Sequence, residues 1–251
     1  APTVEECEAM VEAGRRNKVK LQMGCMKRHD PTLERAHEFA REQMGGQLLV
    51  SGWCFDSAYH GRYVETLGRR PERGEAQVYP EAIASPHLRD VAGYGVHSLD
   101  LVLWFGGPVA KVSTFGVEGD DRTVSVSALE FASGALGTFQ VVRTVQMDWT
   151  EGVQVHGVGG SVIAHTPFPY FHRHADVTIF DAAQQAYMRP AAPGADMYQR
   201  QLEAFARAIF EDGPVSPSGE DGLRDQQVIL AMHESYQTGQ SVQLSESGAR
   251  R

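Results

Sequence analysis

The sequence predicts an α+β fold: an open, mainly antiparallel sheet with helices on one face, preceded by a single helix–strand step of a doubly wound α/β domain. Alternating apolar and polar residues indicate strands in five segments, 109–117, 123–131, 135–145, 153–158 and 162–165. Short turns between these segments favour antiparallel pairing. Apolar residues at helical spacing indicate helices over 31–44, 96–105, 198–211 and 220–237.

Composition narrows the class of protein and its partners. The 251 residues are 42% hydrophobic and 22% charged, which is ordinary for a globular protein with a substantial core. A net charge of −9 argues against a nucleic-acid partner or an anionic membrane surface. No apolar run approaches the roughly 20 residues that a membrane span needs. The three cysteines form no Cys-x-x-Cys pair, so we expect a reducing, cytoplasmic location.

The first residues predict one helix and one strand. Thr3 and Glu6 match a capping box, Gly14 is placed to end the helix, and the apolar run 19–26 indicates a buried strand. Two elements cannot bury themselves, so we expect residues 1–27 to be the last helix–strand step of a doubly wound α/β domain. Residues 28–244 are then a second domain and 245–251 a disordered tail.

A phosphate-binding turn is not predicted within the sequence. No Gly-x-Gly-x-x-Gly pattern follows a predicted strand, and the glycines of 157–160 join two strands instead of a strand and a helix. We therefore expect that this chain by itself cannot bind a dinucleotide in the usual way.

The second predicted domain begins with a helix and a strand. Asp30 is placed as an N-cap and Pro31 as the first helical residue, with a strand expected over 47–55. The following segment, 56–90, is long and irregular, which is typical of a functional segment. It contains polar and aromatic residues suited either to a sugar-like ligand or to an oligomer arm: Tyr59, His60, Arg62, Tyr63, Tyr79 and His87.

The residues that point to chemistry lie at the start of the helix predicted over 96–105. His97 and Asp100 are three residues apart, so both are expected on one helical face and within reach of each other. An imidazole beside a carboxylate is a common arrangement for a general base. The same pair could also serve only as a structural hydrogen bond.

The segment Gly95-Val-His97-Ser-Leu-Asp100 resembles the Gly-x-His-x-x-Asp segment of the Gfo/Idh/MocA oxidoreductases, the relatives of glucose–fructose oxidoreductase and inositol dehydrogenase. Residues 24–31 resemble the family's Gly-x-x-x-Arg-x-x-Pro joint between domains, and 155–161 resemble its Gly-x-x-Gly hairpin. Residues 221–223 and 231–235 resemble its late segments. The resemblance implies that residues 1–27 are the end of a Rossmann-type domain.

The resemblance also implies an activity. It predicts hydride transfer between NAD or NADP and a sugar, cyclitol or related polyol, with His97 as general acid/base and Asp100 orienting it or bonding the substrate. The residues expected to contact substrate are Met26, Lys27, His87, Tyr94, Tyr170 and His172. Arg28 is expected to brace the joint.

A histidine pair and the residue at position 93 also bear on the predicted chemistry. His172 and His174 would share one face of a strand, but no third ligand has a supporting spacing, so no metal site is predicted. Many relatives carry an Asp four residues before the histidine, where this sequence has Gly93. Other sugar chemistry on the same scaffold therefore stays open, as does a non-catalytic sugar-binding or scaffold subunit.

The predicted packing has two consequences. The uncovered sheet face is rich in Val, Leu and Phe, so a homodimer or tetramer is expected to form through it. In the helix over 198–211, Leu202, Phe205 and Ile209 share one side, which we expect to be buried.

Overall fold

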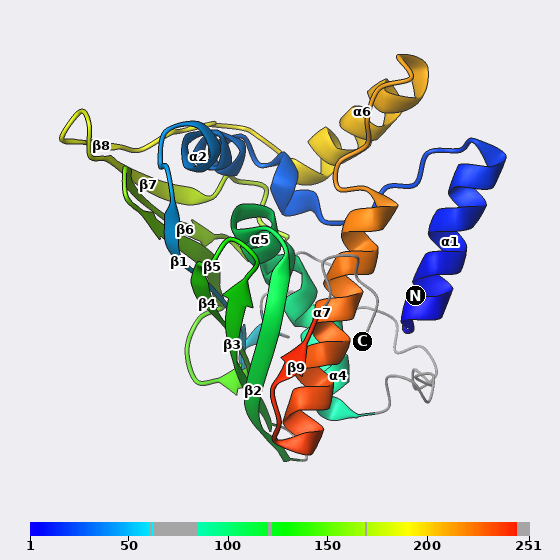
Figure 1. Ribbon diagram of the computed structural model, residues 1–251. Coiled ribbons are helices and arrows are strands. Elements are labelled where there is room, and N and C mark those ends of the chain that lie inside the picture. The colour runs from blue at the N-terminus through cyan, green and yellow to red at the C-terminus, as the bar shows by residue number, and fades with distance from the viewer. Residues whose placement is uncertain (61, 63–84, 120–121, 169, 245–251) are drawn as a thin grey trace.

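The structure is a computed structural model of the 251 residues, and it describes residues 1–60, 62, 85–119, 122–168 and 170–244. Tyr63 and Tyr79, the expected oligomer arm or ligand loop over most of 56–90, and the tail predicted over 245–251 lie outside the described residues. Figure 1 shows a single twisted sheet with helices against one of its faces.

Helix α1 (Val4–Asn17) begins where the sequence predicts but ends later, because Gly14 is buried inside the helix and does not end it. Thr3 and Glu6 make both hydrogen bonds of a capping box, and Lys18 ends the helix in a left-handed conformation. Cys7 and Val11 are buried, and α1 packs against α7 (Gly219–Thr238).

The strand expected over 19–26 is different in the structure. Only Gln22 makes a β-bridge, to Ser218, and Met26–His29 form a short 3₁₀ helix, η1. A strand needs a neighbour for its backbone hydrogen bonds, and the described residues provide one only at this bridge. A domain boundary near residue 27 remains a proposal.

Helix α2 (Pro31–Glu42) begins where the sequence predicts. The Asp30 carboxylate accepts hydrogen bonds from the backbone N–H groups of Thr32 and Leu33, with Pro31 in the first turn. Leu33 and Phe39 are buried, so this helix covers the sheet near β6 and β7.

The sheet has nine strands among the described residues, in the order β8-β7-β6-β5-β1-β4-β3-β2-β9. Every neighbouring pair is antiparallel except β1 and β4, which are parallel. The expected open, mainly antiparallel sheet is thus confirmed. The strands are β1 (Gln47–Ser57), β2 (Val109–Gly119), β3 (Arg122–Phe131), β4 (Leu136–Val145), β5 (Thr150–Gly157), β6 (Gly160–Thr166), β7 (Asp176–Asp181), β8 (Ala186–Met188) and β9 (Val242–Gln243).

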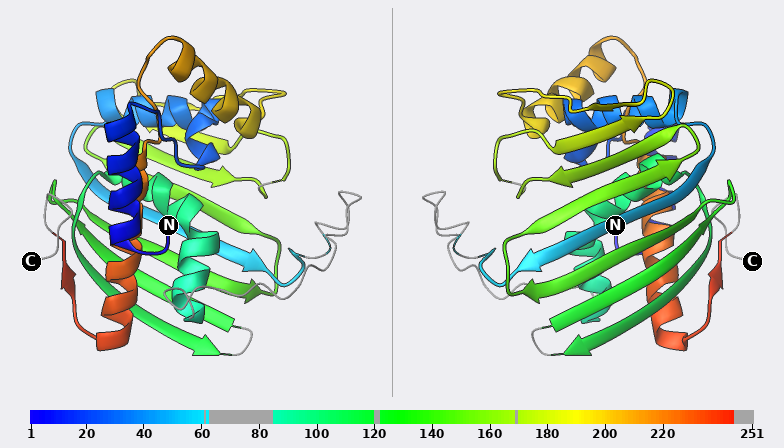
Figure 2. Two further views of the ribbon diagram at one scale, coloured as in Figure 1. Left: turned by 90° about the vertical axis from the view of Figure 1, so that its right-hand side faces the viewer. Right: turned by 90° about the vertical axis from the view of Figure 1, so that its left-hand side faces the viewer.

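The helices leave one sheet face uncovered, as Figure 2 shows in its right-hand view. On the covered face, α4 (Pro86–Asp90), one π-helical turn η3 (Val91–Gly95) and α5 (Val96–Gly106) follow one another without a break. Helix α5 lies directly on β1, where a Cβ at Gly52 would collide with the Val102 side chain. The glycine therefore brings the start of α5 close to the sheet.

Helix α6 (Met197–Phe210) corrects one expectation. Leu202 is 67% exposed and Ile209 is 51% exposed, although their spacing predicted a buried side. Helix α6 stands apart from the sheet in Figure 1 and makes its main contacts with η1. Periodicity identified the helix correctly, but it could not show whether the chain covers that side.

Candidate active site

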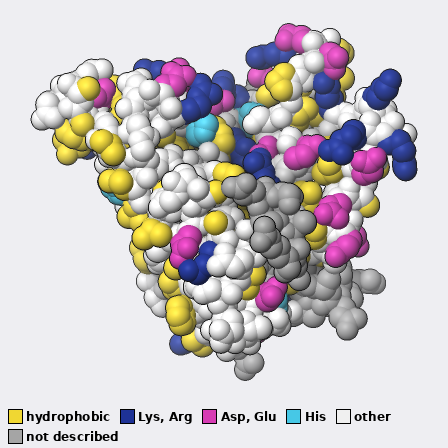
Figure 3. Space-filling view, in the orientation of Figure 1, with side chains coloured by type: hydrophobic (Ala, Val, Ile, Leu, Met, Phe, Trp, Pro, Cys, Tyr) yellow, Lys and Arg dark blue, Asp and Glu magenta, His cyan; other side chains and the backbone are white. Residues whose placement is uncertain are grey.

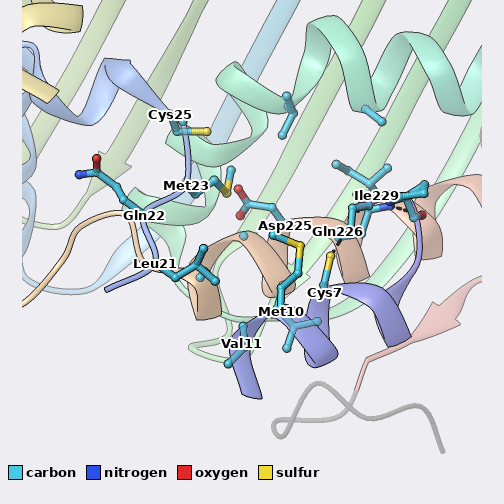
Figure 4. A pocket seen from close by; sticks show the side chains of 18 of the residues that line it. Cys7, Met10, Val11, Leu21, Gln22, Met23, Cys25, Asp225, Gln226 and Ile229 are labelled. Atoms are coloured by element: carbon cyan, nitrogen blue, oxygen red, sulfur yellow. Dashed lines mark hydrogen bonds between the residues drawn. The ribbon is translucent and has the colours of Figure 1, made fainter. Parts of the chain in front are cut away.

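His97 lies in the first turn of α5 and lines a cavity of about 490 Å³. Helices α1 and α7 and the segment 21–25 form the rest of the wall, much of it apolar. Figure 4 shows Leu21, Met23 and Cys25 from that segment facing Asp225 and Ile229 of α7 across the cavity. The size and the few polar groups are typical of a small-molecule site.

The His97 imidazole is held neutral by its surroundings. Burial, and then the positive charge of Lys27, lower the pKa of His97 to about 4. Its Nδ1 atom lies 3.9 Å from Sγ of Cys25. At neutral pH the ring is therefore uncharged and able to accept a proton.

Asp100 pairs with Arg28 and not with His97. The Arg28 Nη2 and Nε atoms donate to the two carboxylate oxygens of Asp100, at 2.6 and 2.9 Å, and both side chains are buried. This bidentate pair joins η1 to α5. The spacing in sequence placed Asp100 near His97, but a buried guanidinium from another element takes both carboxylate oxygens. Arg28 therefore forms a structural ion pair, and its expected role at a joint between domains stays a prediction.

Lys27 belongs to a buried polar triad beside His97. Its ammonium group contacts the carboxylate of Glu151 on β5 and donates to Ser98 Oγ at 3.2 Å, while Ser98 donates to Glu151 at 2.9 Å. Lys27 and the neighbouring Met26 are fully buried. Sequence reasoning did not identify Glu151, and its only signal was a carboxylate within an alternating strand.

Two predicted contact residues, Tyr94 and Tyr170, belong to one chain of aromatic contacts. Ring centroids lie 6.4 Å apart for His60 and Tyr94, 5.4 Å for His60 and Phe168, and 5.4 Å for Phe168 and Tyr170. Trp149 packs on both His60 and Phe168. Tyr94 precedes His97 by only three residues, so this one member of the aromatic cluster lies on the same helical segment as the candidate base.

The other predicted contact residues lie elsewhere. His172 is in a loop, largely exposed, and its Nδ1 lies 2.6 Å from Asp196. His174 is in the same loop and faces the carbonyl of Ala175, so the two rings do not share a strand. His87 lies in α4 and is buried against α7, with its Nδ1 atom 3.2 Å from Nδ1 of His233 on α7.

The two buried histidines give a testable pH dependence. Burial and His233 lower the pKa of His87 to about 4, as burial and Lys27 do for His97. A histidine in the unfolded chain takes up a proton near pH 6.5, so acid favours unfolding in this window. We expect stability to be complete above about pH 6.5 and to fall towards about pH 4, by roughly 1.4 kcal/mol per pH unit for each residue.

Urea unfolding over this pH range measures the effect. The His87→Gln variant should have a shallower slope than the wild type. Equal slopes for wild type and His87→Gln would contradict the assignment.

Comparison with known proteins agrees with this fold. Residues 90–244 match the family model described as "Oxidoreductase family, C-terminal alpha/beta domain". The matched residues contain the strands of the sheet other than β1, together with α5, which carries His97, and α7. The chain therefore belongs to the Gfo/Idh/MocA oxidoreductase family.

Two curated relatives illustrate the similarity. The 1,5-anhydro-D-fructose reductase of Ensifer adhaerens is 28% identical over 246 residues, covering 88% of this chain and 72% of the relative. Inositol 2-dehydrogenase of Rhizobium meliloti (strain 1021) is 28% identical over 144 residues, covering 51% of this chain and 41% of the relative. The chain thus spans only part of the length of each.

Solved structures share the fold at low identity. Aldose-aldose oxidoreductase from Caulobacter crescentus, complexed with glycerol, has a TM-score of 0.74 at 19% identity, covering 97% of this chain and 70% of that one. A levoglucosan dehydrogenase in complex with NADH and L-sorbose has a TM-score of 0.76 at 20% identity, with the same coverage. In the described part of this chain, no helix has the length and apolar character to cross a membrane.

Proposed function

We propose that this chain is part of an NAD(P)-dependent oxidoreductase that acts on a sugar, cyclitol or related polyol, with His97 as general acid/base. The observation that carries the proposal is a neutral imidazole on the wall of a 490 Å³ cavity. The names of relatives support the substrate and cofactor classes, among them D-xylose 1-dehydrogenase (NADP(+)) 2 of Haloferax volcanii. They do not decide between NAD and NADP.

The residues of this chain would act on the substrate hydroxyl. His97 would take its proton during oxidation and return it during reduction, while burial and the positive charge of Lys27 keep the ring neutral between turnovers. Asp100 would act as a positioning residue by fixing α5 to η1 through Arg28. The aromatic cluster of Tyr94, His60, Trp149, Phe168 and Tyr170 offers apolar ring faces with polar edges for a sugar ring.

A dinucleotide does not fit the glycine-rich turn of the described residues. The glycines of 157–160 form the β5–β6 hairpin, and a Cβ at Gly159 would collide with the backbone of residues 43 and 44. No helix begins there, so this turn lacks the N–H groups of a phosphate loop. We propose that the cofactor binds to a domain outside these residues, and that residues 1–27 are the last helix–strand step of that domain.

A second candidate is a sugar-binding or scaffold subunit without catalysis of its own. The engagement of Asp100 by Arg28 favours it, because the ring of His97 then lacks the expected carboxylate partner. The alternative of other sugar chemistry on the same scaffold is supported by the same pairing of Asp100 with Arg28.

One assay separates these functions. The full-length protein is incubated with a panel of sugars and polyols and either NAD⁺ or NADP⁺, and the absorbance of the reduced nicotinamide is followed. Turnover with at least one substrate is expected. Sugar binding measured by calorimetry without turnover would favour the binding subunit, and no binding of any sugar would contradict both.

We also propose that the open sheet face joins subunits of a homodimer or tetramer. Phe115 and Val126 lie opposite each other on β2 and β3 and both are exposed, as are Val117 and Val124. In Figure 3 hydrophobic side chains gather along the left-hand margin, over the strands. An apolar surface of this kind favours burial against another subunit.

A single charged substitution tests whether the open sheet face is a subunit interface. Phe115 is 77% exposed on this face. The variant Phe115→Glu should lower the molar mass measured by light scattering to that of a smaller species. Phe210→Glu on α6 alters an equally exposed phenylalanine away from the sheet and should leave the mass unchanged. A monomeric wild-type protein would refute the interface.

A further inference from the structure

A cluster of potential metal ligands lies at the wall of the cavity beside His97. The Sγ atom of Cys25 and one carboxylate oxygen each from Asp100 and Asp225 all lie within 4.8 Å of one another. Their exposed fractions are 2%, 0% and 2%. The three residues come from the segment before η1, from α5 and from α7, so the tertiary fold assembles them.

The cluster holds one more negative charge than its cations balance when all its carboxylates are ionised. Arg28 contacts Asp100 on two atoms and Asp221 at 3.5 Å, and Arg224 also pairs with Asp221. Asp225 is a third carboxylate in the neighbourhood of Arg28. Two guanidinium groups therefore face three carboxylates, and an uncompensated buried charge is costly.

Asp225 provides an independent observation. Its Oδ2 atom is buried and has no hydrogen-bond partner among the residues that the structure describes. Figure 4 shows its carboxylate extending from α7 towards Met23 and Cys25. A buried carboxylate oxygen without a donor requires either a proton of its own or a cation.

The donor atoms select a class of cation. A thiolate with carboxylates suits zinc and similar divalent transition metals, whereas Mg²⁺ and Ca²⁺ prefer oxygen ligands alone. The Asp100 oxygens bonded to Arg28 each keep a second lone pair. Nδ1 of His97, 3.9 Å from Sγ of Cys25, adds a nitrogen donor at the edge of the cluster.

We propose that Cys25, Asp225 and Asp100 bind one divalent metal ion of the zinc class at the cavity wall beside His97. The ion neutralises the surplus charge of the cluster and fixes the segment before η1 to α5 and α7. It enters through the cavity, because Cys25 and Asp225 both line it. The site does not depend on the proposed oxidoreductase activity.

The competing state is a metal-free cluster that keeps its protons. Burial, then the charge of Asp100, raise the pKa of Asp225, and burial raises the pKa of the Cys25 thiol. Metal binding must displace these protons, so affinity should increase with pH. A neutral thiol and a neutral carboxyl group would instead leave the cluster without metal.

Cobalt(II) is the probe, because thiolate ligation gives it a charge-transfer absorption band. The full-length protein is stripped of metal with a chelator and titrated with Co²⁺, and Zn²⁺ is then added. We expect one equivalent of Co²⁺ to produce the band and Zn²⁺ to remove it. No band, or a band at no defined stoichiometry, would overturn the proposal.

Variants identify the ligands. Cys25→Ser and Cys25→Ala should abolish the band, whereas Cys7→Ser, which removes a second cysteine of the same cavity, should keep it. Asp225→Asn should weaken binding by more than the roughly 10–100-fold typical of outer-shell changes. A band that persists in the Cys25 variants, or unchanged affinity in Asp225→Asn, would refute the site. Circular dichroism confirms folding, and none of these readouts uses turnover.

Discussion

Replacing His97 by alanine should lower turnover by about 10²–10⁴-fold, the usual contribution of a general acid/base. The substrate hydroxyl would lose its proton acceptor, while the cavity and the aromatic cluster would stay in place. The loss should appear in kcat more than in KM, because the proton moves in the transition state. Steady-state kinetics on the full-length protein measure both parameters.

The fold should tolerate this substitution. His97 is neutral, and its described polar contact is a long one to Cys25, so its removal breaks no ion pair. His156→Ala is the matched control, because His156 lies on β5 and does not line the cavity of His97; it should keep full turnover. Full turnover in a folded His97→Ala protein would exclude the proposed base.

The pH profile adds a second criterion. With a pKa of about 4 in the free protein, His97 stays in its basic form across the neutral range. The acid limb of kcat/KM should therefore not reach half-loss through this group until the pH approaches about 4. A half-loss near pH 6.5 that disappears in His97→Gln would show an unperturbed imidazole.

Replacing Arg28 by methionine should destabilise the protein by about 3–5 kcal/mol, the usual cost of removing one partner of a buried ion pair. Asp100 would lose both of its guanidinium hydrogen bonds, and Asp225 and Asp221 would lose the neighbouring positive charge. Urea unfolding at neutral pH gives the free-energy difference. The deficit should shrink in acid, because a protonated Asp100 no longer needs a cation.

A half-exposed ion pair gives the matched control. Arg35 donates to Glu38 at 2.5 Å, but their side chains are 53% and 46% exposed. Arg35→Met should therefore cost at most about 1 kcal/mol. Similar losses in both variants would show that burial of the Arg28–Asp100 pair has no special energetic weight.

Local sequence patterns predicted the elements that depend on neighbouring residues. The capping box of α1, the Asp30 cap of α2 and the alternation in β2, β3 and β4 each follow from interactions within a few residues, and each is present in the structure. Local patterns gave wrong predictions where the outcome depends on a packing partner distant in sequence. The segment 19–26 forms only one β-bridge, and Leu202 and Ile209 of α6 are exposed.

The candidate site also combines features set by local sequence with contacts between distant segments. His97 at the start of α5, the apolar character of α5 and the resemblance that implied a family are properties of the chain in order. The sequence by itself therefore determined most strands of the sheet and the covering helices α2, α5 and α7, and it proposed the candidate base, but it did not predict β7, β8 or α4.

Only the tertiary structure decided what surrounds that base. Arg28 is distant in sequence from Asp100, Lys27 from Glu151, and Cys25 from Asp225, yet each set lies within contact distance. Contacts between buried charges depend on how α5, α7, η1 and β5 approach one another in space, which no periodicity within one segment can specify. The fold thus turned Asp100 from His97 to Arg28 and placed a thiol, instead of a carboxylate, against the imidazole.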